Sequence, residues 1–177
     1  MKKFLSLIVL TSLFFVSCSS DGDQGPQGPP GEDGVNIVGQ AFEVTGVDFV
    51  APDYSIFADI PGEIEVLPSD IVLVYWLEDI DDNDNDIWSL IPQTIYFEDG
   101  QFQYTYNHTD FDVNIFLQGD IDLATLGDFY TQDQIFKVVV LPVDYYANNP
   151  NVDVSTYQNL KASLNIKETN LKSKAHK

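Results

Sequence analysis

The chain has 177 residues with 28 Asp or Glu and 8 Lys but no Arg, which gives a formal net charge of −20. Hydrophobic residues make up 44% of the sequence and aromatic residues 13%, a composition typical of an acidic, ordered chain with one globular domain. Binding to a phosphate backbone requires clustered cations. The charge balance therefore excludes nucleic acid as a partner.

Residues 1–17 have the features of a secretory signal peptide. Lys2 and Lys3 precede an apolar run from Phe4 to Val16. A helix that crosses a bilayer needs roughly 20 apolar residues, so this run is too short for a permanent membrane span. The segment ends in Phe-Val-Ser-Cys, which resembles the lipobox of bacterial lipoproteins, and we expect it to be removed before Cys18.

Cys18 is the only cysteine in the chain, so the sequence cannot form an intramolecular disulfide or a cysteine-based metal site. We expect Cys18 to carry lipid as the first residue of the mature protein. The alternative is cleavage nearby by another signal peptidase, which would leave a free thiol. The lipobox resemblance implies several acyl chains, and each buried CH₂ contributes about 0.8 kcal/mol. The expected partner of this end of the chain is therefore a membrane, which the protein does not span.

Residues 18–36 are predicted to form a spacer with a collagen-like repeat. Glycine recurs at every third position, at Gly22, Gly25, Gly28, Gly31 and Gly34. This period is the signature of a collagen triple helix, in which only glycine fits at the axis. An extended single-chain linker uses the same residues. We expect a monomer rather than a collagen-like trimer, because a trimer would bring the acidic side chains of Asp23, Glu32 and Asp33 together.

The first 36 residues together resemble the collagen-like-repeat lipoproteins of Bacteroidetes. The resemblance lies in the lipobox cysteine, the Ser-Ser-Asp-Gly-Asp that follows it, and the run Gly-Pro-Gln-Gly-Pro-Pro-Gly-Glu-Asp-Gly. It implies an outer membrane lipoprotein in the cell envelope. Asp21 and Asp23 resemble the acidic signal that sends such lipoproteins to the outer surface, so surface exposure is the expected location.

Residues 37–166 are predicted to form an all-β domain, an antiparallel β-sandwich of about 7–8 strands with a short C-terminal helix. Polar and apolar residues alternate around Phe102 and Tyr104 and again around Val113 and Ile115, which predicts strands with one solvent-exposed face. The apolar runs at 71–77 and 138–141 predict central strands covered on both faces. Strands are expected at 37–44, 54–60, 63–67, 71–77, 87–97, 101–107, 111–118 and 134–141.

The C-terminal part of the chain has a different character. Residues 153–155 are predicted to cap a short helix that continues to Leu164. Residues 167–177 contain four Lys and one Glu and have little to bury, so they are predicted to form a frayed basic tail.

No catalytic motif is found in the sequence. The only histidines are His108 and His176, and there is no nucleophile elbow, zinc-protease helix, phosphate-binding loop or dinucleotide-binding loop. His108 lies in a polar Asn-His-Thr-Asp turn, where we expect it to be a hydrogen-bonded turn residue. We predict that the protein is not an enzyme. A glycoside hydrolase with two catalytic carboxylates remains the catalytic alternative.

An acidic cluster at 79–86 is the sharpest candidate site. Its candidate calcium ligands are Asp81, Asn83, Asp84, Asn85 and Asp86. Oxygen ligands at alternate positions suit calcium, but Asp86 and Pro92 stand where an EF-hand needs glycine and a bidentate glutamate. Two interpretations remain: a weak calcium site, which would be the only cofactor, or a solvated hairpin tip whose charges prevent edge pairing.

Aromatic residues on neighbouring strands form a second candidate site. Trp76 and Trp88, together with Tyr96, Tyr104 and Tyr106, could form a platform on which a polysaccharide ligand stacks, or they could be core residues, since strands are rich in such residues. The sequence as a whole predicts a non-catalytic envelope lipoprotein that is structural, adhesive or captures a polysaccharide or protein ligand. The alternative binding function is a calcium-assisted carbohydrate-binding module.

Overall fold

The computed structural model describes residues 39–164 and 166–177. The predicted signal peptide, Cys18 and the 18–36 spacer lie outside the described residues. Within them the chain is mostly β-strand with a few short helices, so the all-β prediction is confirmed. The strands are β1 (Gln40–Val47), β2 (Ser55–Asp59), β3 (Ile71–Ile80), β4 (Asp86–Leu90), β5 (Gln93–Phe97), β6 (Gly100–His108), β7 (Asp112–Gly119), β8 (Gln134–Leu141) and β9 (Lys167–His176).

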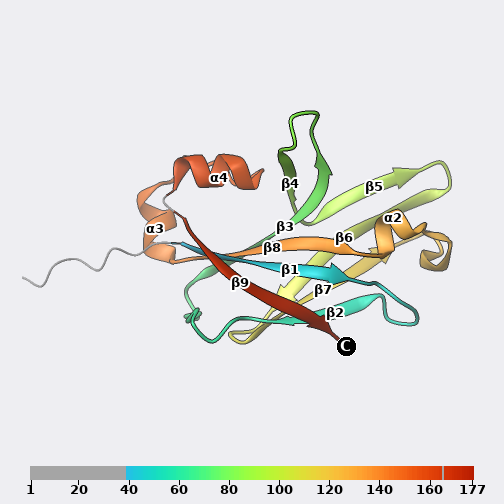
Figure 1. The fold of residues 1–177 in the computed structure, drawn as a ribbon, viewed down its shortest axis with the longest axis horizontal. Coiled ribbons are helices and arrows are strands. Elements are labelled where there is room, and N and C mark those ends of the chain that lie inside the picture. Colours follow the sequence, from blue (N-terminus) through green and yellow to red (C-terminus); the bar gives the residue numbers. More distant parts are fainter. Residues whose placement is uncertain (1–38, 165) are drawn as a thin grey trace, which may run out of the picture. The chain divides into compact units, whose positions relative to one another are not determined.

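The strands form one sheet in the order β4-β3-β8-β1-β9-β2-β7-β6-β5. The sheet is nearly closed, because its two end strands, β4 and β5, follow each other in the chain (Figure 1). The connection between them crosses at Ile91, whose backbone N–H donates to the carbonyl of Val74 at 3.0 Å. All neighbouring strands are antiparallel except β1 and β9, which run parallel.

The main hydrophobic core lies inside the curved sheet. Side chains from both halves of the strand order meet there, among them Phe42, Trp76, Phe102, Tyr104 and Phe136. The Tyr106 hydroxyl donates to the Val72 carbonyl at 2.8 Å, so it joins β6 to β3 across this interior. Apolar packing in this interior therefore joins strands from both halves of the strand order.

A second hydrophobic cluster covers the outer face of β1, β3, β4 and β8. Helix α4 (Tyr157–Ser163) lies over this face and buries Tyr157 and Leu160 against Tyr75 and Trp88. The Thr156 side chain caps α4 by accepting from the Asn159 N–H at 3.2 Å. The predicted helix is thus present, although it begins after 153–155. Three further short elements are η1 (Leu123–Thr125), α2 (Asp128–Thr131) and α3 (Val143–Asn148).

Several predicted strands match the structure closely, and two do not. β8 has the predicted bounds, and β3 and β8 are interior strands of the sheet as expected. The segment 63–67 is not a strand: turns at Pro61–Ile64 and Leu67–Asp70 fold it so that Ile64 and Val66 are buried without a partner strand. The predicted 87–97 strand is two strands, because Pro92 offers no N–H to a ladder and the chain passes there from one end of the sheet order to the other.

The basic C-terminal segment is the largest difference from the sequence-based prediction. Residues 167–177 were expected to be frayed, but β9 is an interior strand that lies between β1 and β2 (Figure 1). Its first part pairs with β1, and Phe57 and Ala58 of β2 pair with His176 and Ala175. Because two neighbours supply hydrogen bonds along its length, a strand forms where few apolar side chains are available. The prediction of a purely antiparallel sheet was also wrong at this strand.

Candidate functional site

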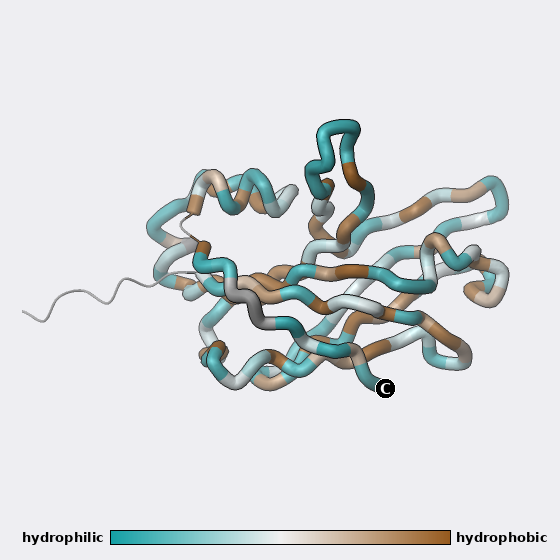
Figure 2. Tube along the Cα trace, in the orientation of Figure 1, coloured by the Kyte–Doolittle hydropathy of each residue, from teal (hydrophilic) through white to brown (hydrophobic). Residues whose placement is uncertain are grey.

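The acidic loop forms the tip of the β3–β4 hairpin, which is among the most hydrophilic parts of the described chain (Figure 2). One carboxylate organises this tip. Asp81 Oδ1 accepts hydrogen bonds from the backbone N–H groups of Asn83 at 2.8 Å and Asn85 at 2.9 Å, and Asn85 Nδ2 is 3.1 Å from both Asp81 oxygens. Asp84 adopts a left-handed conformation with φ of 61°. The Asp81 carboxylate therefore stabilises the turn by accepting hydrogen bonds from residues within it.

These contacts lower the pKa of the Asp81 carboxyl, chiefly through the hydrogen bonds from Asn85 and then those from Asn83. The side chains of Asn83, Asp84 and Asp86 are exposed. Within residues 39–164 and 166–177, no three acidic or histidine side chains are grouped as ligands of one metal ion. A calcium ion would have to share the Asp81 carboxylate with the donors whose hydrogen bonds it already accepts.

The two tryptophans proposed for ligand stacking are buried, each with an exposed fraction of 3%. They also lie on opposite faces of the sheet, since Trp76 belongs to the interior core and Trp88 to the cluster beneath α4. The Trp76 indole donates to Gln134 Oε1 at 2.8 Å. The stacking platform predicted for Trp76 and Trp88 is therefore wrong, because core packing occupies both rings.

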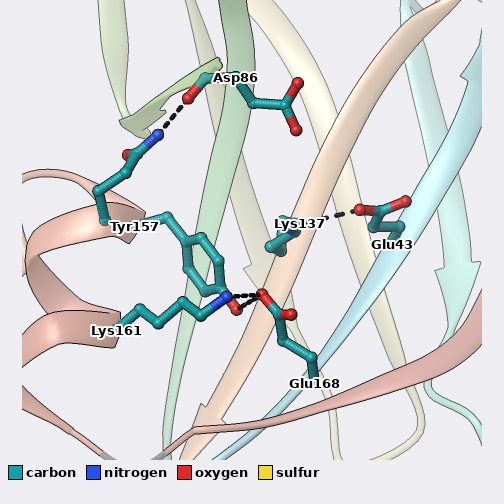
Figure 3. Close-up of polar contacts among 7 residues, drawn as sticks. Glu43, Asp86, Lys137, Tyr157, Lys161 and Glu168 are labelled. Carbon is teal, nitrogen blue, oxygen red and sulfur yellow. Dashed lines mark hydrogen bonds and ion pairs between the residues drawn. The ribbon is translucent and has the colours of Figure 1, made fainter. Parts of the chain in front are cut away.

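Lys137 anchors the helix-covered face (Figure 3). Its ammonium lies 4.3 Å from the ring centroids of both Trp88 and Tyr157 and 3.4 Å from Glu43 Oε1. Such a cation between two rings and a carboxylate is attracted by all three. The position joins β8 to β1, β4 and α4, so Lys137 has a structural partner on every side.

Glu168 completes the contacts between α4 and β9 (Figure 3). Its Oε1 accepts from the Tyr157 hydroxyl at 2.8 Å and from Lys161 Nζ at 2.9 Å. These hydrogen bonds, with that from Lys161 the larger, lower the pKa of the Glu168 carboxyl. Gln158 of the same helix also donates to the backbone carbonyl of Asp86. Side chains along the helix thus fasten it to β4 and β9.

The opposite half of the sheet has an outer face that none of the described helices covers, and we call it the open face. It is formed by β5, β6, β7 and β2. Directly opposed residues of antiparallel strands share a face, so the strand register defines its members. Away from its ends all of them are uncharged: Ser55, Phe57, Thr94, Tyr96, Gln101, Gln103, Thr105, Asn107, Asn114, Phe116 and Gln118.

The open face is arranged in rows that cross the strands. One row joins Thr94 to Gln103 and Gln103 to Gln118. The next row contains Phe116, which is opposite Ser55 on β2. The first row thus contains only hydroxyl and amide groups, whereas in the second row Phe116 lies between Thr105 and Ser55, with about 4.8 Å between neighbouring strands.

A hollow of about 250 Å³ lies on the open face over β5, β6 and the end of β7. It is lined by three amide residues and four others: Gln101, Gln103, Gln118, Thr94, Phe102, Gly119 and Asp120. Tyr96 is 76% exposed and stands beside Gln101 on the neighbouring strand. Three amide side chains, each with donors and an acceptor, thus converge on one solvent-accessible hollow next to an exposed ring.

Several other ionisable groups in the described structure are buried or held by hydrogen bonds. Burial raises the pKa of the phenols of Tyr75, Tyr104 and Tyr157 far above 10.0, so these groups are protonated hydrogen-bond donors at neutral pH. Hydrogen bonds from Ser155 lower the pKa of Asp153. His108 is exposed, with its Nδ1 3.3 Å from the Thr109 carbonyl in the turn. A general acid of a glycosidase needs a raised carboxyl pKa, the opposite of the shifts at Asp81, Asp153 and Glu168.

The sequence did not single out the open face, although it contained part of the signal. The alternation around Phe102 and Tyr104 identifies the solvent-facing residues of β6 correctly. It does not say which strand lies beside β6, so it cannot bring Gln103 and Gln118 together. In so acidic a chain, the feature that could have indicated the site is a strand such as β6, whose solvent-facing residues are polar but uncharged.

No described helix has the length and apolar character needed to cross a membrane. The chain matches no protein-family model, no curated protein and no solved structure to which it was compared. The assignment of function rests on the site itself.

Proposed function

We propose that the protein is a non-catalytic lipoprotein of the cell envelope, anchored through Cys18, that captures a ligand at its surface. In this proposal the two halves of the sheet act as a β-sandwich that presents the open face to the outside, and residues 18–36 are a spacer. The protein is a monomer on an outer membrane exposed to the medium. The lipobox-like sequence and the glycine period support the anchor and the spacer.

The open face is the single observation that carries the binding function. Sheet faces that have no binding role in an acidic protein are expected to carry part of its charge, yet the members of the open face away from its ends are all uncharged in a chain with a net charge of −20. Binding sites combine apolar or aromatic surface with a few convergent polar groups. The amide-lined hollow beside Tyr96 has both parts.

Solid-phase binding tests this function. The full chain, purified in detergent, is applied to immobilised neutral polysaccharides, anionic polysaccharides and gelatin. A variant with Gln103→Glu and Gln118→Glu places two charges on the open face without changing side-chain size. A control with Asn148→Asp and Asn151→Asp adds the same charge at exposed positions elsewhere.

We expect at least one ligand to bind the wild type and the control but not the open-face variant. Absence of binding to the whole panel, or equal binding by all three proteins, would contradict the proposal. Release of reducing sugar from a bound polysaccharide would instead identify the protein as a hydrolase.

A further inference from the structure

We infer that the ligand of the open face is an uncharged polysaccharide chain that lies diagonally across β5, β6, β7 and β2. This inference rests on the proposed function and adds the class and the path of the ligand. It follows from the positions of the aromatic rings, the amides and the surrounding charges.

The aromatic residues of the open face lie along a diagonal. Tyr96 is on β5, Phe116 is two strands away on β7, and Phe57 is on β2 in the next row. Gln103 on β6 lies between Tyr96 and Phe116. With about 4.8 Å between strands and about 6.8 Å between successive residues on one face, the path from Tyr96 to Phe57 is on the order of 25 Å long. This length suits an extended chain rather than a single sugar.

The chemistry along this path suits sugar rings. The electron-rich face of an aromatic ring attracts the C–H groups on the flat face of a pyranose. Tyr96 is 76% exposed, Phe116 is half-buried, and Phe57 is 37% exposed with its ring stacked on that of His176 at 6.2 Å. Gln101, Gln103 and Gln118 line the hollow together with Asp120, and Tyr96 is opposite Gln101 on the neighbouring strand. An amide both donates and accepts hydrogen bonds, which matches hydroxyl groups that do the same.

The charges around the path disfavour ionic ligands. Asp120 lines the rim of the hollow, and Asp59 and Asp112 are opposite each other at the far end of the open face. These carboxylates repel a polyanion. Lys172 and Lys174 of β9 lie in a separate hollow that they share with Asp59, Glu63 and His176. His176 Nε2 is 3.1 Å from Asp59 Oδ1, so carboxylates accompany the basic residues of this hollow. A polycation would find no carboxylate among the central residues of the path. An uncharged ligand is the class that the open face matches.

Affinity electrophoresis of the full chain in detergent tests the inference. The probes are soluble mixed-linkage β-glucan, xyloglucan and galactomannan, with alginate and polygalacturonate as anionic counterparts. Tyr96→Ala removes the most exposed ring of the open face. Phe111→Ala is the matched control, because Phe111 is 79% exposed but lies in the turn before β7.

We expect one of the neutral probes to retard the wild type, and Tyr96→Ala to weaken this binding about ten-fold, as expected for the loss of one aromatic contact. Phe111→Ala should bind as the wild type does. The affinity should also stay within about two-fold between about 0.05 and 0.5 M NaCl, because a neutral ligand gains nothing from charge pairing that salt screens.

The possible failures are distinguishable. Binding of an anionic probe or gelatin that is lost with Gln103→Glu and Gln118→Glu would overturn the inference but leave the proposed function intact. Equal weakening by Tyr96→Ala and Phe111→Ala would overturn the diagonal path. Absence of any ligand sensitive to the open-face substitutions would overturn both the inference and the proposed function.

Discussion

Single buried side chains link strands that are far apart in the sequence, and Gln134 is a clear example. Its Oε1 accepts from the Trp76 indole at 2.8 Å, and its Nε2 donates to the carbonyls of Phe129 at 2.9 Å and Gln132 at 2.7 Å. Gln134 is 8% exposed, so a lost partner is not easily replaced by water. The amide thereby links β3, α2 and β8.

We predict that Gln134→Met lowers the free energy of unfolding by about 1–3 kcal/mol, because it leaves a buried indole N–H without an acceptor. Trp76→Phe removes that donor as well. In a double-mutant cycle measured by urea unfolding, the double variant should lose less stability than the sum of the two single variants. Strict additivity would mean that the hydrogen bond contributes nothing beyond packing.

At the scale of elements, α4 and β9 depend on each other through Glu168. A carboxyl with a lowered pKa stabilises the folded state above its ordinary pKa of 4.5, and this stabilisation is lost as the pH falls through the lower folded value. The side chain is 47% exposed, so solvent screening keeps the effect small.

We predict that Glu168→Gln lowers the stability by up to about 1 kcal/mol at neutral pH, and that the difference from the wild type disappears toward about pH 3. Urea unfolding from about pH 7 to about pH 3 measures it. Glu65→Gln, at an exposed position, is the control. A difference that does not change with pH would exclude the carboxylate as its cause.

The hairpin tip between β3 and β4 carries the calcium prediction. Five aspartates between residues 79 and 86 attract a divalent ion, but the Asp81 carboxylate already accepts hydrogen bonds within the loop. We predict a dissociation constant on the order of 10⁻⁴ to 10⁻³ M for calcium, with weaker binding of magnesium, which requires a stricter octahedron. Calorimetry of the wild type beside a variant with Asp81→Ala and Asp84→Ala decides the question. The same calcium response in both proteins would identify the tip as merely solvated.

At the scale of elements, local sequence patterns predict single strands but not which distant strands pair with them. Alternation and apolar runs predict strands such as β8, because the sequence of such a strand shows by itself which of its side chains can be buried. The 63–67 segment has the same pattern, but it lies between turns and has no partner strand. β9 is a strand for the opposite reason, since β1 and β2 supply its hydrogen bonds. The open face and the burial of Trp76 and Trp88 depend on strand order, which a single sequence does not encode locally.

At the scale of the whole molecule, β9 determines whether the sheet is continuous. It lies between the β4-β3-β8-β1 half and the β2-β7-β6-β5 half. We predict that removal of residues 167–177 lowers the free energy of unfolding by about 3 kcal/mol or more, because the ladders with β1 and β2 are lost. The freed edges of β1 and β2 should also promote self-association.

Urea unfolding and size-exclusion chromatography measure these two effects. A variant with Lys172→Gln and Lys174→Gln keeps the backbone ladder while removing two cations, so it should remain close to the wild type. If this variant were as unstable as the truncated chain, charge rather than strand pairing would explain the contribution of β9.

The proposed anchor would determine where the open face can act, and in this proposal it depends on Cys18. We predict that Cys18→Ala moves the protein from the membrane fraction to the soluble fraction, because the proposed acyl chains provide the hydrophobic attachment. Cell fractionation and incorporation of labelled fatty acid measure this, with Ser20→Ala as the neighbouring control. Membrane retention of Cys18→Ala, or a wild type without label, would contradict lipidation. Release combined with unchanged ligand binding would locate anchoring and capture in separate parts of the chain, as a surface-displayed binding domain requires.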